Sequence, residues 1–406
     1  MLSSSKFRTP SLKQLVAGLV AVFSLFPFTT IVDFGTYTQP YALLMGMTFL
    51  PFMFNTQIDL TSGIAFYWLL FYGTILYFWA IIDESPIGPL KYLVAHITPL
   101  FISFPAFYLA RFHLVFFRKL VLFSSFLWVT TAIIQITIDP SFMTFLVGSW
   151  SSAGEVVVAS GRGVLSLAPE PTTFGFHLII LGALSYLLSG NGRVSALIIL
   201  GSLLLAISSS SLLVLIMAFS IGIACNISLR LLAKVFLFGL VAVSFFLVLP
   251  SLNLENYSNL RIFDLLKLAY EKPEMLLADS SVNARLGGLF VSIFEPIIRI
   301  FIPFGLSLSD WLVEREFLLA KYSFLLGLSG SGMPSGYFIL LYQGGVLFVP
   351  FLLYMGHKIL AIRSFAPKDR WLVLGAIIVP LFQFSLASPT FWLFWGVFLE
   401  RTSRKF

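Results

Sequence analysis

The chain has 406 residues, of which 58% are hydrophobic and only 11% charged, and its mean hydropathy is +0.96. No soluble domain of this length sustains that composition, so the sequence predicts a polytopic membrane protein without room for separate soluble domains. The net charge of +7 fits basic residues that mark the cytoplasmic side of a membrane, so nucleic acid is not expected as a partner. The single cysteine, Cys225, excludes a disulfide framework and a cysteine metal site.

Residues 1–14 are basic and precede an apolar segment without a small-residue cleavage site, which predicts a cytoplasmic tail. After this tail, apolar runs separated by charged or turn-rich breaks predict an all-α fold with about twelve transmembrane helices. Their approximate ranges are 15–32, 38–54, 64–82, 91–110, 120–138, 173–189, 194–208, 210–228, 235–252, 335–355, 371–387 and 389–399.

The distribution of charge predicts the orientation of these helices. With the N-terminus in the cytoplasm, the inner segments hold sixteen basic and three acidic residues, and the outer segments hold nine basic and fifteen acidic residues. The short inner loops therefore carry the excess of Lys and Arg that the positive-inside rule requires. An even number of helices also places the C-terminus in the cytoplasm.

Two outer segments are too long to be simple turns, residues 139–172 and 253–334. The first nine helices then occupy 15–252, and the last three, with the cytoplasmic C-terminus, occupy 335–406. In the larger outer loop, 260–270 has the spacing of an amphipathic surface helix. The stretch 291–304 is apolar but broken by prolines, which predicts a segment that dips into the membrane interface or packs over the bundle. The loop approaches the tenth helix through small residues and is expected to close over a site and to move.

The most informative stretch is GRGVLSLAPEPTTFGFH at 161–177, where a charged, proline-containing segment leads into an apolar helix. Pro171 suits the first position of that helix, where its missing N–H costs nothing. The helix N-terminus, with its unpaired N–H groups and partial positive charge, would then lie beside Glu170 and near Arg162. This arrangement predicts a site for an anion such as phosphate.

Several features together resemble the Wzy and WaaL families, the O-antigen and exopolysaccharide polymerases and the related O-antigen ligases of bacteria. The first feature is an arginine followed by EPTTFG ahead of a helix, which here are Arg162 and Glu170–Gly175. The second is a pair of helices joined at a small polar cluster, AISSSSLLVLI. The third is one large outer loop that contains SVNARLGGLF and leads into PSGYFILLYQGGVLFVPFLLYM.

The resemblance implies a GT-C-like membrane fold and a glycosyltransferase activity without a cofactor. The implied substrates are glycans linked to undecaprenyl pyrophosphate, and the implied location is the inner membrane, with the active site facing the periplasm. A membrane protein that regulates chain length is an implied partner. Many family members carry an arginine in the polar cluster, where this chain has only serines, and ligases place a histidine in the large loop, where this chain has none. The missing histidine favours a polymerase.

The implied reaction needs cations for the leaving pyrophosphate and a base for the acceptor hydroxyl. Arginine suits the first task because its planar fork stays charged and binds phosphate oxygens with two hydrogen bonds. The predicted glycan- and pyrophosphate-binding residues are Arg162, Arg285, Arg261 and Arg299, of which the last two have contacts with lipid headgroups or solvent as their alternative role. The predicted catalytic residues are Glu170, the first candidate for the base, and His177, about two turns further along one helix face.

No outer segment has the spacing of a metal site, so metal-independent catalysis is expected. Attack opposite the leaving group would invert the anomeric centre. The same residues also have structural interpretations. Glu170 can cap its helix, and His177 can be a packed core histidine. Arg162 can be a solvated loop residue, and Arg285 can pair with Asp279 or anchor the loop.

Two other functions stay open at this point. The nearer alternative is an O-antigen ligase, in which lipid A core or another acceptor replaces the second lipid-linked glycan. The more distant alternative is a transporter or flippase of lipid-linked oligosaccharides. A transporter would place ionisable groups near the middle of the bilayer, whereas the charges of this chain lie mainly near helix ends and in outer loops.

Overall fold

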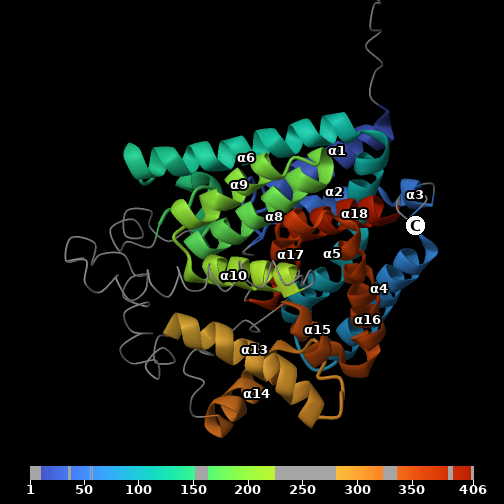
Figure 1. The fold of residues 1–406 in the computed structure, drawn as a ribbon. Helices are drawn as coiled ribbons and strands as arrows, with labels where there is room; N and C mark the ends of the chain where they lie inside the picture. The colour runs from blue at the N-terminus through green and yellow to red at the C-terminus, as the bar shows by residue number, and fades with distance from the viewer. Residues whose placement is uncertain are drawn as a thin grey trace, which may run out of the picture.

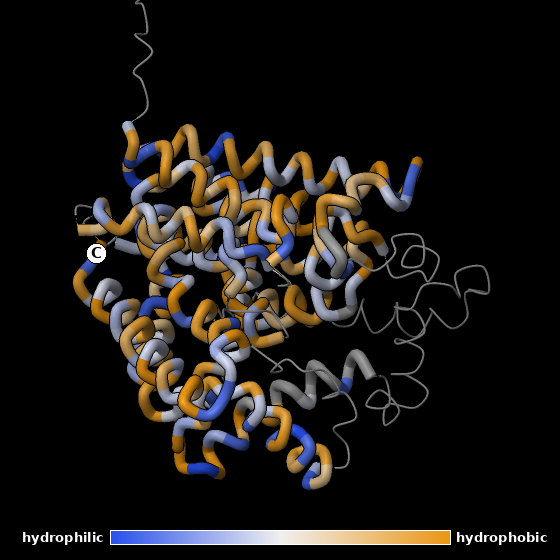
Figure 2. The backbone as a smooth tube through the Cα atoms, turned by 180° about the vertical axis from the view of Figure 1, so that it is seen from behind, coloured by the Kyte–Doolittle hydropathy of each residue, from blue (hydrophilic) through white to orange (hydrophobic). Residues whose placement is uncertain are grey.

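The computed structural model of the protein describes residues 11–34, 38–54, 56, 58–150, 163–224, 280–322, 336–382 and 387–403. Every regular element in these ranges is a helix, as Figure 1 shows, and this confirms the all-helical prediction for the described part of the chain. Hydrophobic residues occur along nearly all of these helices (Figure 2).

Within these described ranges, five helical segments are long and apolar enough to cross a membrane. They are α4 (Leu60–Ala80), α5 (Ile87–Phe112), α6 (Leu114–Thr137), α8 (Pro171–Ser189) and Leu340–Ser364, which runs through α15 (Gly336–Gly344), η5 (Gly345–Phe348), α16 (Val349–Leu360) and η6 (Ala361–Ser364). Shorter apolar helices are α1 (Leu12–Leu25), α9 (Gly192–Leu204) and α10 (Ser209–Ala224). The chain is thus a helical membrane protein. The predicted helix at 235–252 lies outside the described residues.

The first two predicted helices are wrong in extent. The helix expected at 15–32 ends at Leu25, shortly before Pro27. The helix expected at 38–54 is broken into two short pieces, α2 (Tyr41–Met47) and α3 (Leu50–Met53). Pro51 explains the break, because proline has no N–H to donate and its ring clashes with the carbonyl four residues earlier. The apolar composition of 38–54 concealed this local signal.

The helices α5, α8 and α18 (Pro389–Ser403) are largely buried and form the centre of the bundle. α18 packs along α5, and Gly396 allows the close approach, because a Cβ atom there would lie 2.3 Å from the Ser103 carbonyl oxygen. Small residues at such crossings let helix backbones come together in membrane proteins. Large aromatic side chains, including Trp392 and Trp395, fill the surrounding core.

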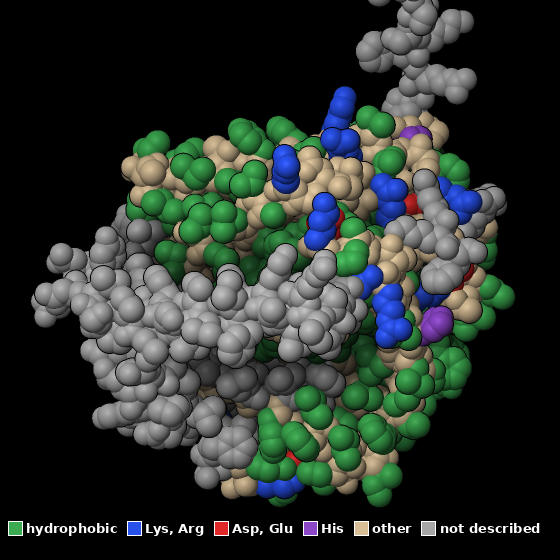
Figure 3. All heavy atoms as spheres, in the orientation of Figure 1, with side chains coloured by type: hydrophobic (Ala, Val, Ile, Leu, Met, Phe, Trp, Pro, Cys, Tyr) green, Lys and Arg blue, Asp and Glu red, His purple; other side chains and the backbone are tan. Residues whose placement is uncertain are grey.

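Basic side chains gather toward one end of the bundle, at the right of the view in Figure 3. There Lys358, at the end of α16, forms a 2.9 Å ion pair with Asp59, which caps the start of α4. Arg401, near the end of α18, donates a 2.6 Å hydrogen bond to the Leu187 carbonyl near the end of α8. Each pair joins segments that the charge distribution places on the same side of the membrane. We refer to this as the basic end.

Contacts at the opposite end also join segments that are predicted to lie on one side of the membrane, the outer side. The Glu84 carboxylate accepts hydrogen bonds from the backbone N–H groups of Leu308 and Ser309 at 2.8 and 3.1 Å. These amides lie at the start of α14 (Leu308–Lys321), so a residue after α4 holds part of the large predicted loop. In addition, the Thr30 N–H donates to the Leu146 carbonyl at 2.6 Å.

The described part of the large loop contains two helices, α13 (Ser280–Ile298) and α14, which lie together below the bundle in Figure 1. A small second core of Val291, Trp311, Leu318 and Tyr342 joins them to α15. The helix α14 was not predicted, although Ser307 is a typical N-cap residue and its hydroxyl accepts a hydrogen bond from the Asp310 N–H. The surface helix predicted at 260–270 lies outside the described residues.

Candidate functional site

The helix that carries the proposed base begins at Pro171, as the sequence predicts, with Glu170 at its N-cap position. Glu170 has an extended backbone, with φ −144° and ψ 150°, and its carbonyl accepts a hydrogen bond from the Phe174 N–H. Its side chain makes no capping hydrogen bond and is exposed. The carboxylate therefore does not close back onto the helix and is accessible to another molecule.

The segment before Glu170 is fastened to α6 through Gln135. The Gln135 side chain accepts a hydrogen bond from the Ser166 N–H at 2.6 Å and donates to the carbonyls of Ser166 and Phe142 at 3.0 and 2.8 Å. The Ser166 hydroxyl adds a 2.7 Å bond to the Trp128 carbonyl. Ser166 has a positive φ of 52°, which is rare for a residue other than glycine and is sustained here by these buried bonds.

Two of the family-like motifs meet beside this segment. The Ser208 hydroxyl, in the serine cluster, donates a 3.2 Å hydrogen bond to the Thr172 hydroxyl, in EPTTFG. The segment that follows Arg162 contacts the residue just before the AISSSSLLVLI motif, because the Val164 N–H donates to the Leu205 carbonyl at 3.1 Å. Gly163 makes this approach possible: a Cβ atom there would lie 2.3 Å from the Ala206 carbonyl oxygen, and its φ of 85° favours glycine.

The N-termini of α8 and α10 consequently lie at the same end of the bundle, next to each other. Helix N-termini carry unpaired N–H groups and a partial positive charge, so this junction is disposed to bind an anion. Besides Glu170, its polar side chains are small hydroxyls, and the Ser211 hydroxyl is fully buried without a hydrogen-bond partner. Across the described ranges, no three His, Cys, Asp or Glu side chains gather in a way that could hold a metal ion.

His177 lies two turns further along α8, in the core of the bundle, where its side chain is 1% exposed. Its Nε2 donates a 3.1 Å hydrogen bond to the Leu25 carbonyl, and its Nδ1 lies 3.4 Å from the Thr390 hydroxyl. The ring also packs against Trp128, with 4.2 Å between the ring centroids. These contacts fit the packed-histidine interpretation: His177 joins α8 to α1 and α18, and it is not exposed beside Glu170.

Arg299, predicted to bind substrate, follows α13 and is engaged within the protein. Its guanidinium forms an ion pair with Glu314 and lies over the rings of Phe304 and Tyr342, with 5.4 and 5.7 Å to their centroids. Burial acts to lower the pKa of Arg299, but the hydrogen bond to Glu314 and the nearby acids outweigh it and raise the pKa. The charged group therefore ties α13, α14 and α15 together.

The structure says little about the other three predicted arginines. For Arg285, on α13, it describes the backbone but not the side chain. Arg162 and Arg261 lie outside the described residues. The structure therefore brings Glu170 to the junction of the two motifs, places His177 in the core and Arg299 in the α13–α14 pair, and leaves the roles of the remaining arginines as predictions.

Sequence reasoning missed Gln135 and Glu84, which position the site segment and the large loop. Gln135 has a recognisable signal, because it is the only amide side chain in α6 and lies in a membrane-spanning helix, where polar groups are costly without partners. Glu84 has no comparable signal. Its partners lie more than two hundred residues further along the chain, and only the fold brings them together.

Comparisons with known proteins do not assign the chain to a family. A scan against models of protein families finds no match for the chain, and a search of curated proteins finds none either.

Proposed function

We propose that the protein is a bacterial cell-surface polysaccharide polymerase that resembles the Wzy family. It would transfer a glycan from undecaprenyl pyrophosphate to a sugar hydroxyl of another lipid-linked repeat unit. The observation that carries this proposal is the contact between Ser208 and Thr172, which joins two motifs of the resemblance beside an exposed Glu170. The proposal includes about twelve transmembrane helices in a GT-C-like arrangement.

The two ends of α8 support the proposed orientation. Glu170 is the N-cap residue of the helix, and Leu187, near its other end, accepts a hydrogen bond from Arg401 at the basic end. The site junction is therefore at the end opposite the basic residues. With the basic end in the cytoplasm, the site faces the periplasm at the outer surface of the inner membrane, and both termini are cytoplasmic.

The proposed donor site uses the adjoining N-termini of α8 and α10. Their N–H groups and partial positive charge would stabilise the negative charge that grows on the pyrophosphate as the glycosidic bond breaks. Arg162 immediately precedes Gly163, where the chain passes close to Ala206, and Arg285 belongs to α13. These two arginines are the proposed cations. Catalysis through helix N-termini and arginines is metal-independent in this proposal.

Glu170 is the proposed base. Its carboxylate is exposed at the entrance to the anion site, where an acceptor hydroxyl can approach it. The proton leaves the hydroxyl oxygen as that oxygen attacks the anomeric carbon, and the bond to the pyrophosphate breaks on the opposite face, which inverts the centre. We assign His177 a positioning role, because its hydrogen bond to Leu25 holds α8 in place.

The proposal is tested by polymer formation in a deletion strain, read as a ladder on a gel, with expression in the membrane measured for each variant. Glu170→Gln is expected to abolish the ladder, and Arg162→Ala and Arg285→Ala to weaken it strongly. Glu316→Gln is the matched control, because Glu316 is an exposed acid on α14 at the same end of the protein. Normal ladders from the three site variants would show that the chemistry lies elsewhere.

Two further readouts separate polymerase from the alternatives. If the chain is a ligase, single repeat units fail to reach the final acceptor in the Glu170→Gln strain, whereas a polymerase defect leaves that transfer intact. If the chain is a transporter, purified protein in detergent does not elongate lipid-linked repeat units, because transport needs two compartments. Elongation in detergent would therefore exclude pure transport.

A further inference from the structure

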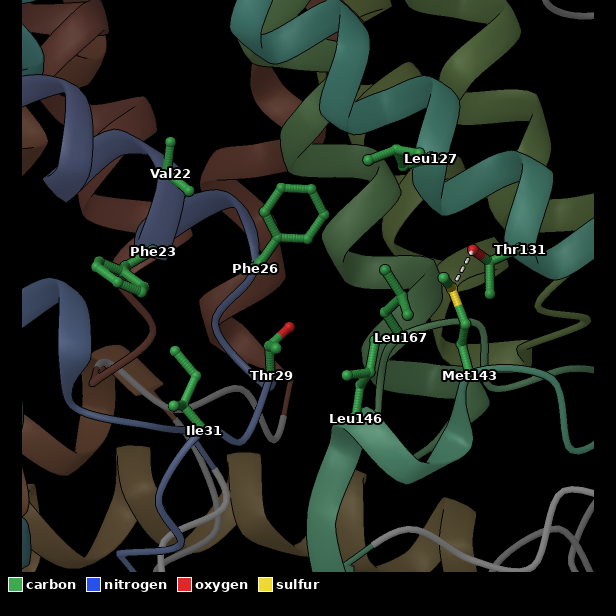
Figure 4. Close-up of a pocket in the computed structure, with 10 residues that line it drawn as sticks. All are labelled: Val22, Phe23, Phe26, Thr29, Ile31, Leu127, Thr131, Met143, Leu146 and Leu167. Atoms are coloured by element: carbon green, nitrogen blue, oxygen red, sulfur yellow. Dashed lines mark hydrogen bonds between the residues drawn. The ribbon is translucent and has the colours of Figure 1, made fainter.

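A hydrophobic pocket of about 270 Å³ lies between α1, α6 and the segment around η1 (Thr144–Trp150). Figure 4 shows its walls, which come from four separate parts of the chain. α1 and the residues after it contribute Val22, Phe23, Phe26, Thr29 and Ile31, α6 contributes Leu127 and Thr131, and the remaining wall is Met143, Leu146 and Leu167. Only the two threonines bring a hydroxyl to this lining, so the pocket suits hydrocarbon.

The pocket opens onto the hydrophobic outer surface of the bundle. Ile31 forms part of its wall and is nevertheless 69% exposed, so this side of the pocket faces outward. On α6, the exposed Phe123 lies one helical turn before the pocket residue Leu127, and on α1, the exposed Leu19 lies one turn before Phe23. The apolar surface that faces the lipid in a membrane protein therefore continues into the pocket.

Two of the segments that line the pocket carry acids and no basic residues. Residues 26–34 contain Asp33, and residues 139–147 contain Asp139, while Lys and Arg are absent from both stretches. Asp139 accepts hydrogen bonds from the N–H and hydroxyl of Ser141, which hold its carboxylate in place. A diphosphate head would be repelled by these two acids, whereas an ammonium head would be attracted.

We propose that this pocket binds one acyl chain of an amine-bearing phospholipid, such as phosphatidylethanolamine, as a tightly held lipid. The hydrophobic lining takes the chain, and its opening admits the chain from the bilayer. The negative charge of Asp33 and Asp139, on two of the segments that line the pocket, favours the ammonium group over an anionic head. Leu167 links the pocket to the site segment, because it lies next to Ser166, which Gln135 fastens to α6. This inference goes beyond the proposed glycosyltransferase function and does not depend on it.

The test uses the full chain purified in a mild detergent. Native mass spectrometry measures the phosphatidylethanolamine that stays bound to wild type, to Leu127→Trp and to Val22→Phe, which fill the pocket from opposite walls. Phe126→Trp is the matched control, because Phe126 is the neighbour of Leu127 but is 64% exposed. We expect bound lipid to fall about tenfold or more in the two filling variants, as several CH₂ groups lose their burial, and to stay unchanged in the control.

A second measurement on wild type does not depend on any variant folding correctly. Phosphatidylethanolamine, phosphatidylglycerol and polyprenyl diphosphate, each with a photoreactive group in the hydrocarbon chain, are compared in separate samples. The proposal requires labelling of the peptides that contain Met143 and Leu167, strongest with phosphatidylethanolamine. Equal or stronger labelling by either anionic lipid, or labelling only outside the pocket, would overturn it. Equal lipid retention by properly folded pocket-filling variants and wild type would overturn it as well.

Discussion

The hydroxyls of Ser208 and Thr172 lie 3.2 Å apart and form a hydrogen bond across 36 positions of the sequence. This bond joins the start of α8 to the turn that leads into α10, so two helix N-termini face one region. Because the proposed pyrophosphate site is made of these N-termini, the alignment of α8 with α10 is expected to control activity directly.

Removal of the bond between Ser208 and Thr172 should impair the site more than the fold. Thr172→Val is expected to cost about 0.6 kcal/mol of stability, typical of a hydrogen bond between membrane helices. Ser208→Ala is expected to cost more, because the Ser208 hydroxyl also accepts a 3.4 Å hydrogen bond from the Ser211 N–H at the start of α10. The double variant should cost little more than Ser208→Ala alone, because both substitutions remove the bond between the two hydroxyls. Thermal unfolding in detergent measures stability, and the polymer ladder should weaken in all three variants. Fully additive effects would contradict the proposed coupling.

Gln135→Leu should destabilise the segment that carries Glu170. The substitution leaves the buried N–H and C=O of Ser166 without their partner, at a cost of about 1–3 kcal/mol for each unsatisfied group. We expect a clearly lower unfolding temperature and a weaker polymer ladder. Thr137→Ala is the control on the same helix, because the exposed Thr137 hydroxyl bonds only to the Ile133 carbonyl. Equal stability of the two variants would show that Gln135 does not hold the segment.

The close crossing of α5 and α18 makes Gly396 intolerant of a larger side chain. Gly396→Ala would place Cβ 2.3 Å from the Ser103 carbonyl oxygen, so the helices must separate. Overpacking of this kind costs about 1–3 kcal/mol. Gly356→Ala on α16 is the matched control, because no atom lies within 4 Å of a Cβ atom built there. The unfolding temperature should fall for Gly396→Ala and stay level or rise for Gly356→Ala, and the opposite order would refute this packing.

The hold of Glu84 on α14 predicts a dependence on pH. Burial acts to raise the pKa of Glu84, but the hydrogen bonds from the Leu308 and Ser309 amides outweigh it and lower the pKa below the ordinary 4.5. Because the pKa is depressed in the folded protein, the stabilisation is present above pH 4.5 and is lost as the pH falls through the folded value.

Hydrogen exchange at residues 308–321 measures this loosening. After correction for intrinsic exchange, protection should be high at pH 6 and decrease below pH 4.5. In Glu84→Gln, protection should already be reduced at pH 6 and should change little with pH. If protection in Glu84→Gln depends on pH in the same way as in wild type, other acids cause the effect.

The elements that the sequence predicted well are those with local causes. Pro171 set the start of α8, and Gly190, which has a positive φ of 69°, ends that helix where the apolar run stops. The break at Pro51 was also a local signal, but a uniformly apolar window concealed it. Hydrophobicity alone therefore identified membrane helices more reliably than it identified their continuity.

The parts of the candidate site that escaped prediction depend on contacts between distant segments. Nothing near Gln135 in the sequence indicates that its amide pairs with Ser166, and Glu84 finds its partners only after the chain has crossed the bundle several times. His177 illustrates the converse error. Its spacing from Glu170 suggested a shared cavity, but the packing of α1 and α18 around α8 buries it in the core.

The most direct test of the proposed function is elongation of a lipid-linked repeat unit by the purified protein in detergent. Wild-type protein is expected to form a ladder of longer glycans on the undecaprenyl pyrophosphate carrier and to release carrier at each step. A Glu170→Gln variant that has the same unfolding temperature as wild type is expected to bind the substrate and form no ladder. A wild-type protein that elongates nothing, or a Glu170→Gln variant that elongates as fast as wild type, would contradict a polymerase with Glu170 as its base.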